Sequence, residues 1–129
     1  MTISKFEDLE IWQLARTLSK DVYQTTNTRE FKSDVRFCSQ IRAAVGSIMD
    51  NIAEGFEREG KKEFIQFLYV VKGSCGEVRS QLYRALDVEY ISKEQCDLLL
   101  EQTRIVGLKI FNTIQYLKQS TIGGKKYKE

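Results

Sequence analysis

Histidine and proline are both absent from this chain of 129 residues. Without histidine the protein lacks the usual general base near neutral pH, the usual partner of a serine or cysteine nucleophile, and the Glu-x-x-His ligands of di-iron bundles. The glycines form neither a phosphate loop nor a dinucleotide fingerprint, because one pair at 73 and 76 interrupts a helical pattern and another lies at 123 and 124. We therefore expect no enzyme, no metal site and no cofactor.

Long apolar runs are missing as well, which limits where the protein can reside. No apolar stretch approaches the roughly 20 residues that span a membrane, and charged residues throughout the first twenty exclude a secretory signal. The three cysteines, Cys38, Cys75 and Cys96, are odd in number, widely spaced, and placed on or beside apolar stripes. We expect buried, reduced thiols in a cytoplasmic protein.

Helical periodicity extends over nearly the whole chain, and the lack of proline permits long helices. Apolar residues at steps of three or four predict helices over about residues 8–25, 33–57, 60–86 and 92–117. Similar lengths and short links predict an all-α, antiparallel up-and-down four-helix bundle. We expect one domain over residues 1–119.

The expected helix ends carry residues that suit them. Ser33 or Asp34 is a good N-cap for the second helix, and Gly60 can cap the third. Ser92 and Gln95 have the spacing of a capping box at the start of the fourth helix. The remaining link, residues 25–32, is expected to be a polar connection.

The second helix has two different faces. Beside its apolar stripe runs a narrower face that contains Ser47 and Arg58, with small residues between the two faces. Small groups mixed with amides suggest packing on more than one side. In the third helix, Gly73 and Gly76 each cost about 1 kcal/mol relative to alanine. We expect that cost to reflect close backbone approach to Gly46 or Ala43.

Several motifs carry a family resemblance: Gln-Ile-Arg-Ala at 40–43, Ser-Ile at 47–48, Asn-Ile-Ala-Glu-Gly at 51–55 with Arg58, Phe-Glu-Asp-Leu-Glu-Ile-Trp at 6–12 and Lys-Glu-Phe at 62–64. Together they resemble the 23S rRNA intervening sequence protein family, also called the four helix bundle protein family. Met49 stands where many members have proline, and Gly60 where serine or threonine is usual. The resemblance implies an up-and-down bundle that assembles into a homopentamer, with a poorly defined biochemical role.

A set of polar residues on the second and third helices allows two interpretations. Glu54 and Glu77 could pair as acid and base or as ligands of a hard metal ion. We prefer a structural polar layer, because buried charge is tolerated mainly when it is paired. This layer would comprise Gln40, Arg42, Asn51, Glu54, Glu77 and Arg79.

Apolar residues also exceed what one four-helix core requires. Some lie off the main stripes of the third and fourth helices: Ile65, Tyr69, Leu98, Ile105, Leu108 and Phe111. One interpretation is a broad core face with scattered exposed side chains, which are ordinary in soluble proteins. We prefer an oligomer interface, since a second apolar stripe would be a liability in a monomer.

Positive charge is concentrated at the C-terminus. Residues 118–129 hold four lysines and one glutamate, so this segment has a net charge of +3. The whole chain has a net charge of +2, so residues 1–117 have a net charge of −1. The composition of the C-terminal segment predicts a flexible basic tail over residues 120–129, which either keeps the protein soluble or attracts nucleic acid. The candidate nucleic-acid-binding residues are Lys118, Lys125, Lys126, Tyr127, Lys128, Arg58, Lys61 and Lys62.

Two functions from different classes follow. The first is a non-enzymatic oligomeric module that binds RNA or a ribonucleoprotein, as the resemblance suggests. The second is an oligomeric scaffold that binds another protein, for example as an accessory to a reverse transcriptase, without recognising nucleic acid itself. Its partners would be copies of itself together with RNA or a nucleic-acid-processing protein, and no membrane.

Overall fold

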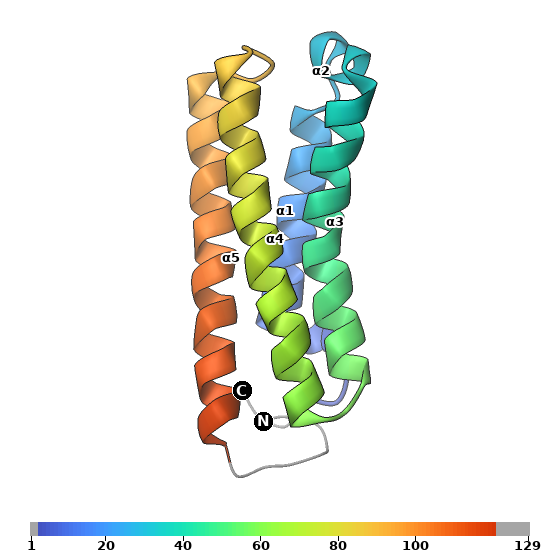
Figure 1. Ribbon diagram of the computed structural model, residues 1–129, viewed down its shortest axis with the longest axis vertical. Helices are drawn as coiled ribbons and strands as arrows, with labels where there is room; N and C mark the ends of the chain where they lie inside the picture. The colour runs from blue at the N-terminus through green and yellow to red at the C-terminus, as the bar shows by residue number, and fades with distance from the viewer. Residues whose placement is uncertain (1–2, 121–129) are drawn as a thin grey trace.

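The computed structural model describes residues 3–120, and over that range it consists of helices and short connections (Figure 1). The elements are a 3-10 helix η1 (Phe6–Asp8), α1 (Glu10–Thr25), α2 (Arg29–Ser33), α3 (Val35–Glu57), α4 (Lys61–Asp87) and α5 (Lys93–Gln119). The expectation of an all-α helical bundle is confirmed. None of these helices combines the length and the apolar character needed to cross a membrane.

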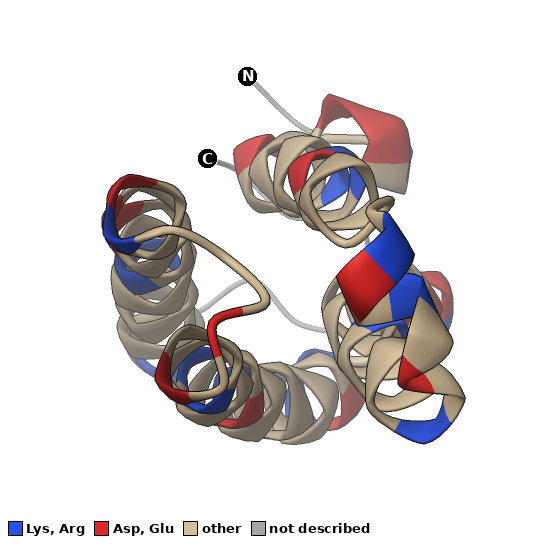
Figure 2. Cartoon of the chain, turned by 90° about the horizontal axis from the view of Figure 1, so that it is seen from above, with Lys and Arg blue, Asp and Glu red and all other residues tan. Residues whose placement is uncertain are grey.

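The four long helices surround a shared interior (Figure 2). α1 packs against α3 and α5, and α4 packs against the same two helices. Successive long helices run in opposite directions, so the α3–α4 connection, η1 and the end of α5 lie at one end, which we call the lower end (Figure 1). α2 and the α4–α5 connection lie at the opposite, upper end.

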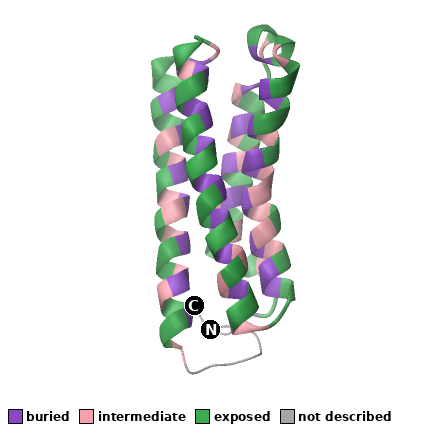
Figure 3. Cartoon of the chain, in the orientation of Figure 1, coloured by how far each residue is buried: buried purple, intermediate pink, exposed green. Residues whose placement is uncertain are grey.

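The core follows the apolar stripes. Buried positions recur along every long helix, separated by exposed ones (Figure 3). The largest fully buried side chains are Phe31, Phe56, Phe64, Leu18, Ile41, Ile48, Ile52, Leu68, Leu82, Ile110, Ile114 and Leu117. Cys38, Cys75 and Cys96 are buried and unpaired, which confirms the prediction of buried thiols.

Local signals in the sequence place the helix ends. Asp34 is the N-cap of α3, where its carboxylate accepts a hydrogen bond from the Phe37 backbone N–H at 3.2 Å. Ser92 and Gln95 form the expected capping box of α5. Gly60 precedes α4 as predicted. The side chains of Asp34, Ser92 and Gln95 satisfy backbone groups that a helix terminus leaves without a partner.

The connection over residues 25–32 is not simply polar, so this expectation was incomplete. It contains most of α2, which is capped by Thr28 and carries the fully buried Phe31. The Phe31 ring stacks against Phe37, with ring centres 5.2 Å apart. A segment of five helical residues is too short for periodicity to reveal, and its helix is stabilised by burying this one ring.

The expected role of the α4 glycines was wrong. A Cβ atom built on Gly73, Gly76 or Gly46 would meet nothing within 4 Å. Close approach between α3 and α4 occurs instead at Gly55, where a Cβ atom would lie 2.6 Å from Phe67 Cβ. Gly73 and Gly76 lie on the outer surface, so they leave space on the outside of the bundle.

Candidate nucleic-acid interface

The lower end of the bundle gathers basic residues from distant parts of the sequence. α3 ends just before Arg58, α4 begins at Lys61, and α5 ends just after Lys118. Lys61 donates a hydrogen bond to the carbonyl oxygen of Ser120, so the chain continues from α5 beside the start of α4. Four of the eight predicted residues, Arg58, Lys61, Lys62 and Lys118, therefore share this end. Lys125, Lys126, Tyr127 and Lys128 lie outside the described residues.

These cations differ in what they contact. Arg58 forms a 2.9 Å ion pair with Glu54, and its guanidinium lies 5.2 Å from the centre of the Phe67 ring. Lys118 donates a 2.7 Å hydrogen bond to the Tyr69 hydroxyl and lies 5.3 Å from the centre of that ring. The Glu54 carboxylate thus balances the charge of Arg58, whereas Lys118 contacts only a neutral aromatic side chain in these two interactions.

A groove of about 490 Å³ runs between α4 and α5. We call it the α4–α5 groove, and it is lined by Lys72, Cys75, Gly76, Arg79, Thr103, Arg104, Gly107, Leu108 and Phe111. Gly76 and Gly107 are the reason that it is hollow, because neither fills the space between the helices with a side chain. A Cβ atom on Gly107 would lie 3.9 Å from Cys75 Cβ, which marks the groove floor.

Cations and an aromatic ring share this groove. Lys72 Nζ lies 5.7 Å from the centre of the Phe111 ring. Arg104 makes two hydrogen bonds to Glu101, at 2.8 and 2.7 Å. These bonds raise the pKa of Arg104 and lower that of Glu101, so both stay charged near neutral pH. The groove therefore places cations beside an exposed ring face.

The floor of the groove is electrically neutral. Burial raises the pKa of the Cys75 thiol to about 11, although the charge of Arg79 acts in the opposite direction. The thiol is therefore protonated at neutral pH and is a poor nucleophile. Cys75 contributes to the packing of the floor and adds no negative charge to it.

Two basic residues of this groove were missed in the sequence, Lys72 and Arg104. The signal that could have revealed them is a spacing of seven residues, two helical turns, which places side chains on one face. Lys72 and Arg79 share this spacing on α4. Arg104, Phe111 and Lys118 share it on α5.

The six predicted interface residues do not form one stripe. Leu108 and Phe111 line the α4–α5 groove, and Tyr69 contacts Lys118 near its lower end. Leu98 and Ile105 lie on the other side of α5, in the row of Gln102 and Lys109, which bond to Asp21 and Glu10 of α1. Ile65 is partly buried against the core.

Residues 7–112 match the family model of the 23S rRNA-intervening sequence protein. The match covers most of the chain. The protein belongs to the 23S rRNA-intervening sequence protein family. No curated protein matches the sequence.

In this family member the expected internal polar layer is absent, and that prediction was wrong for the single chain. Gln40, Glu54, Glu77 and Arg79 are exposed, while Arg42 and Asn51 are half-buried. Glu54 pairs with Arg58, the C-cap residue that follows its own helix, and not with Arg42 or Arg79. Long charged side chains that flank an apolar stripe reach water and avoid the cost of desolvation.

The remaining members of that set have other contacts. Arg42 donates a 3.0 Å hydrogen bond to the Thr26 hydroxyl, and its guanidinium lies 4.6 Å from the centre of the Tyr23 ring. Asn51 donates to the carbonyl and the hydroxyl of Ser47, both at 2.8 Å. These contacts fix α1 to α3 and stabilise α3 locally.

A second groove, of about 480 Å³, lies between α3 and α4. It is lined mainly by small or polar residues, namely Gln40, Ala43, Ala44, Ser47, Glu77, Ser80, Gln81 and Arg84. The buried Gln81 Oε1 has no hydrogen-bond partner. Arg84 lies against the Phe37 ring, 4.3 Å from its centre. Opposite charges occur together here, so this groove has no excess of cations.

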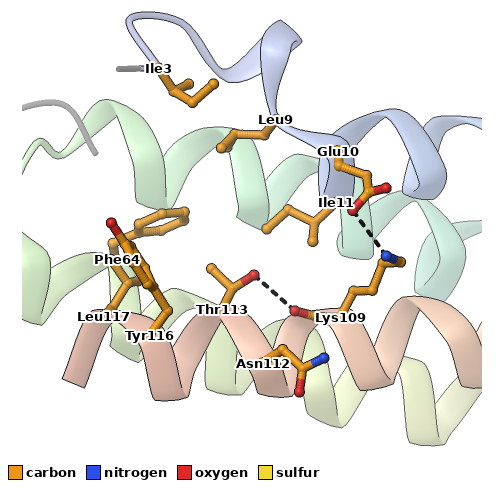
Figure 4. Close-up of a pocket in the computed structure, with 10 residues that line it drawn as sticks. All are labelled: Ile3, Leu9, Glu10, Ile11, Phe64, Lys109, Asn112, Thr113, Tyr116 and Leu117. Atoms are coloured by element: carbon orange, nitrogen blue, oxygen red, sulfur yellow. Dashed lines mark hydrogen bonds and ion pairs between the residues drawn. The ribbon is translucent and has the colours of Figure 1, made fainter. Parts of the chain in front are cut away.

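A cavity of about 360 Å³ lies near the lower end, between the start of the chain, α4 and α5 (Figure 4). Its apolar walls come from Ile3, Leu9, Ile11, Phe64 and Leu117. At its polar side Lys109 forms a 3.1 Å ion pair with Glu10, and Thr113 donates to the Lys109 carbonyl oxygen. The Thr113 hydroxyl donates to a backbone carbonyl rather than to a side-chain base, so it does not form the nucleophile–base pair of a catalytic site. Residues 3–120 also contain no cluster of acidic residues and cysteines suited to a metal ion.

Proposed function

We propose that this protein is a non-enzymatic RNA-binding module that acts as a homo-oligomer. The observation that carries the proposal is the row of cations along α4 and α5: Lys72, Arg79, Arg104 and Lys118. Glu101 is the carboxylate bonded to one of them. Clustered lysine and arginine side chains attract phosphates and release counterions when they bind, which favours association.

The row also explains how a body with a charge of −1 can attract a polyanion. Attraction at contact depends on the local arrangement of charge, because a charge farther away than about 8–10 Å is screened at physiological salt. Lys61 adds a further cation at the lower end, where it donates a hydrogen bond to the carbonyl oxygen of Ser120. We therefore assign the body a share of the binding that its total charge does not indicate.

Fluorescence anisotropy with a labelled structured RNA, measured across a salt series, tests this function. The key variant combines Lys72→Ala, Arg79→Ala and Arg104→Ala. Its matched control combines Lys20→Ala, Arg29→Ala and Lys32→Ala, which removes the same charge from exposed positions on α1 and α2. Each lost phosphate contact should reduce the slope of log affinity against log salt by about 0.7–0.9. We expect a reduction of about 2 in the groove variant and a much smaller one in the control.

A deletion of residues 120–129 distinguishes the contribution of the tail from that of the body. We expect the slope of log affinity against log salt to become flatter but to remain measurable. If only the deletion weakens binding, the tail carries the function and the groove does not. If the intact protein binds no RNA even at low salt, RNA binding is wrong and the protein-binding scaffold takes its place.

The oligomer is proposed on separate grounds. Leu98 is 63% exposed and lies on the side of α5 away from the groove, in the same row as the half-buried Ile105. The family resemblance implies five subunits, so light scattering should give about five times the chain mass of 15.0 kDa. Leu98→Glu should reduce that mass without loss of helicity. A mass near that of one chain for the unmodified protein would contradict the proposal.

A further inference from the structure

We infer that the α4–α5 groove binds single-stranded nucleic acid, with bases stacked on Phe111 and Tyr69 and with phosphates held by the surrounding cations. This inference rests on the proposed RNA-binding function and names the form of RNA that the site takes. The groove would recognise two features of the ligand, the flat faces of unpaired bases and the negative charge of the phosphate backbone. Neither depends on base sequence.

The first step of the argument is the exposure of the two rings. Phe111 is 44% exposed and Tyr69 is 47% exposed, although neither position is required to be aromatic by the core. Each ring has an ammonium group within about 6 Å of its centre, Lys72 at Phe111 and Lys118 at Tyr69. A base that stacks on either ring therefore brings its phosphate beside a cation already in place.

The second step is the length of the site. Arg104, Phe111 and Lys118 lie two turns apart in succession on α5, so they span about 21 Å at 1.5 Å per residue. The charges of one stacked strand recur about every 3.4 Å along its axis, so about six nucleotides fit that length. The cations thus follow the path of a short strand along the helix, with an aromatic residue between the two basic ones.

The third step is the shape of the site. Gly76 and Gly107 leave a groove of about 490 Å³ in front of Leu108 and Phe111, which is room for an inserted base. In an A-form duplex the base faces are stacked on one another and cannot reach a ring at the side of a groove. Single strands expose those faces. The site should therefore prefer a single strand to a duplex of the same length.

The groove chemistry also predicts how RNA and DNA compare. Stacking faces and cations recognise bases and phosphates, which both nucleic acids have, whereas recognition of RNA alone uses contacts to the 2′-hydroxyl. A single-stranded DNA of the same sequence should bind within a few-fold of the RNA. The site is therefore selective for strandedness and tolerant of the sugar.

The test measures anisotropy of labelled 12-nucleotide RNA, its duplex, and the matching single-stranded DNA. The sharpest variant is Gly76→Leu, which fills the groove without a change of charge and meets no atom within 4 Å at its Cβ position. Its matched control is Gly73→Leu, on the same helix and equally free of neighbours, but outside the groove lining. We expect Gly76→Leu to weaken single-strand binding at least tenfold and Gly73→Leu to leave it within twofold.

Loss of an aromatic face gives a second measurement. Phe111→Ala should weaken single-strand binding by about 5- to 150-fold, the range found for one base–aromatic stack. The salt slope should stay unchanged, because no charge is removed. Lys72→Ala should instead reduce the slope. Circular dichroism melting and light scattering of each variant establish that fold and particle mass are retained.

Three results would overturn the inference. Equal binding of duplex and single strand, with no effect of Gly76→Leu or Phe111→Ala, would leave RNA binding intact but place it elsewhere. A changed particle mass in both variants would make the groove a subunit interface. Absence of binding to every oligonucleotide would remove the proposed function itself, a different outcome from the first two.

Discussion

The Tyr90 hydroxyl donates a 3.0 Å hydrogen bond to one carboxylate oxygen of Asp34, which lies 56 residues earlier in the chain. The other oxygen of Asp34 accepts from the Phe37 backbone N–H and caps α3. One carboxylate therefore caps a helix and also fastens the α4–α5 connection to it. The hydrogen bond, together with burial and the charge of Asp34, raises the pKa of Tyr90, so the hydroxyl keeps its proton.

Asp34→Ala should destabilise the protein by more than about 1 kcal/mol, the usual cost of a lost N-cap, because it also removes the acceptor for Tyr90. Asp34→Asn should cost less, since asparagine also caps helices. Urea unfolding monitored by circular dichroism measures both. A double-mutant cycle with Tyr90→Phe should show coupling, and strictly additive effects would contradict the link between the two residues.

Gly73→Ala and Gly76→Ala should each stabilise the protein by up to about 1 kcal/mol, because both positions are helical and their new methyl groups meet open space. Thermal and urea unfolding provide the measurement. Gly55→Ala is the contrasting variant. Its methyl group would overlap Phe67, so we expect a loss of about 1–3 kcal/mol. Destabilisation by all three would mean that the outer face of α4 is covered in the assembled protein.

Glu54→Ala should change the free energy of unfolding by less than about 0.5 kcal/mol, because its partner is Arg58 one turn away and both side chains are more than half exposed. If Glu54 belonged to an internal polar layer, the same substitution would cause a large loss in the free energy of unfolding. Chemical unfolding at low and moderate salt is the appropriate assay. A loss of about 3 kcal/mol or more would instead indicate that oligomer assembly buries the ion pair.

The Cys75 thiol should make stability fall with pH in the alkaline range. Its pKa rises on folding from 9.0 to about 11, so the folded state holds the proton more tightly than the unfolded chain. The resulting stabilisation is fully present below about pH 9 and is lost as the pH rises to about 11. Two pKa units correspond to about 2–3 kcal/mol.

Urea unfolding at several pH values between 8 and 11 would measure this loss. Cys75→Ala is the control, since it lacks the thiol but keeps the other groups that titrate in this range. The variant should show a smaller decline of stability with pH. Identical slopes for both proteins would show that burial does not hold the Cys75 proton. Resistance of native Cys75 to thiol reagents at pH 7 is expected from the same burial.

Much of the fold was predictable because its signals are local. Asp34, Gly60 and the Ser92–Gln95 pair mark helix starts through bonds to backbone groups within one turn. Apolar spacing identified Ile41, Ile48 and Ile52 as core residues, and all are fully buried. Phe31 was missed, since its burial depends on Phe37 and Tyr90, which approach it only in the folded chain.

The candidate site was less predictable. Lys118, Arg58, Lys61 and Lys62 were proposed from charge alone, and the fold does bring them to one end. Lys72 and Arg104 were overlooked, although each lies seven residues from another basic or aromatic residue on its helix. Such spacing places groups on one helix face, but it does not say which neighbouring helix that face meets.

The sequence by itself determined the long helices, the caps of α3 and α5, the buried stripes and the family, because each depends on contacts within a turn or on the residue pattern. Only the tertiary structure decided which neighbouring helix the polar residues beside those buried stripes face. Glu77 and Arg79 lie about 200° apart around α4, and the rotation of α4 about its axis turns Glu77 into the groove toward α3 and Arg79 into the groove toward α5. Packing of the whole bundle sets that rotation, so it decides that Arg79 joins Phe111 and Arg104 rather than an internal polar layer.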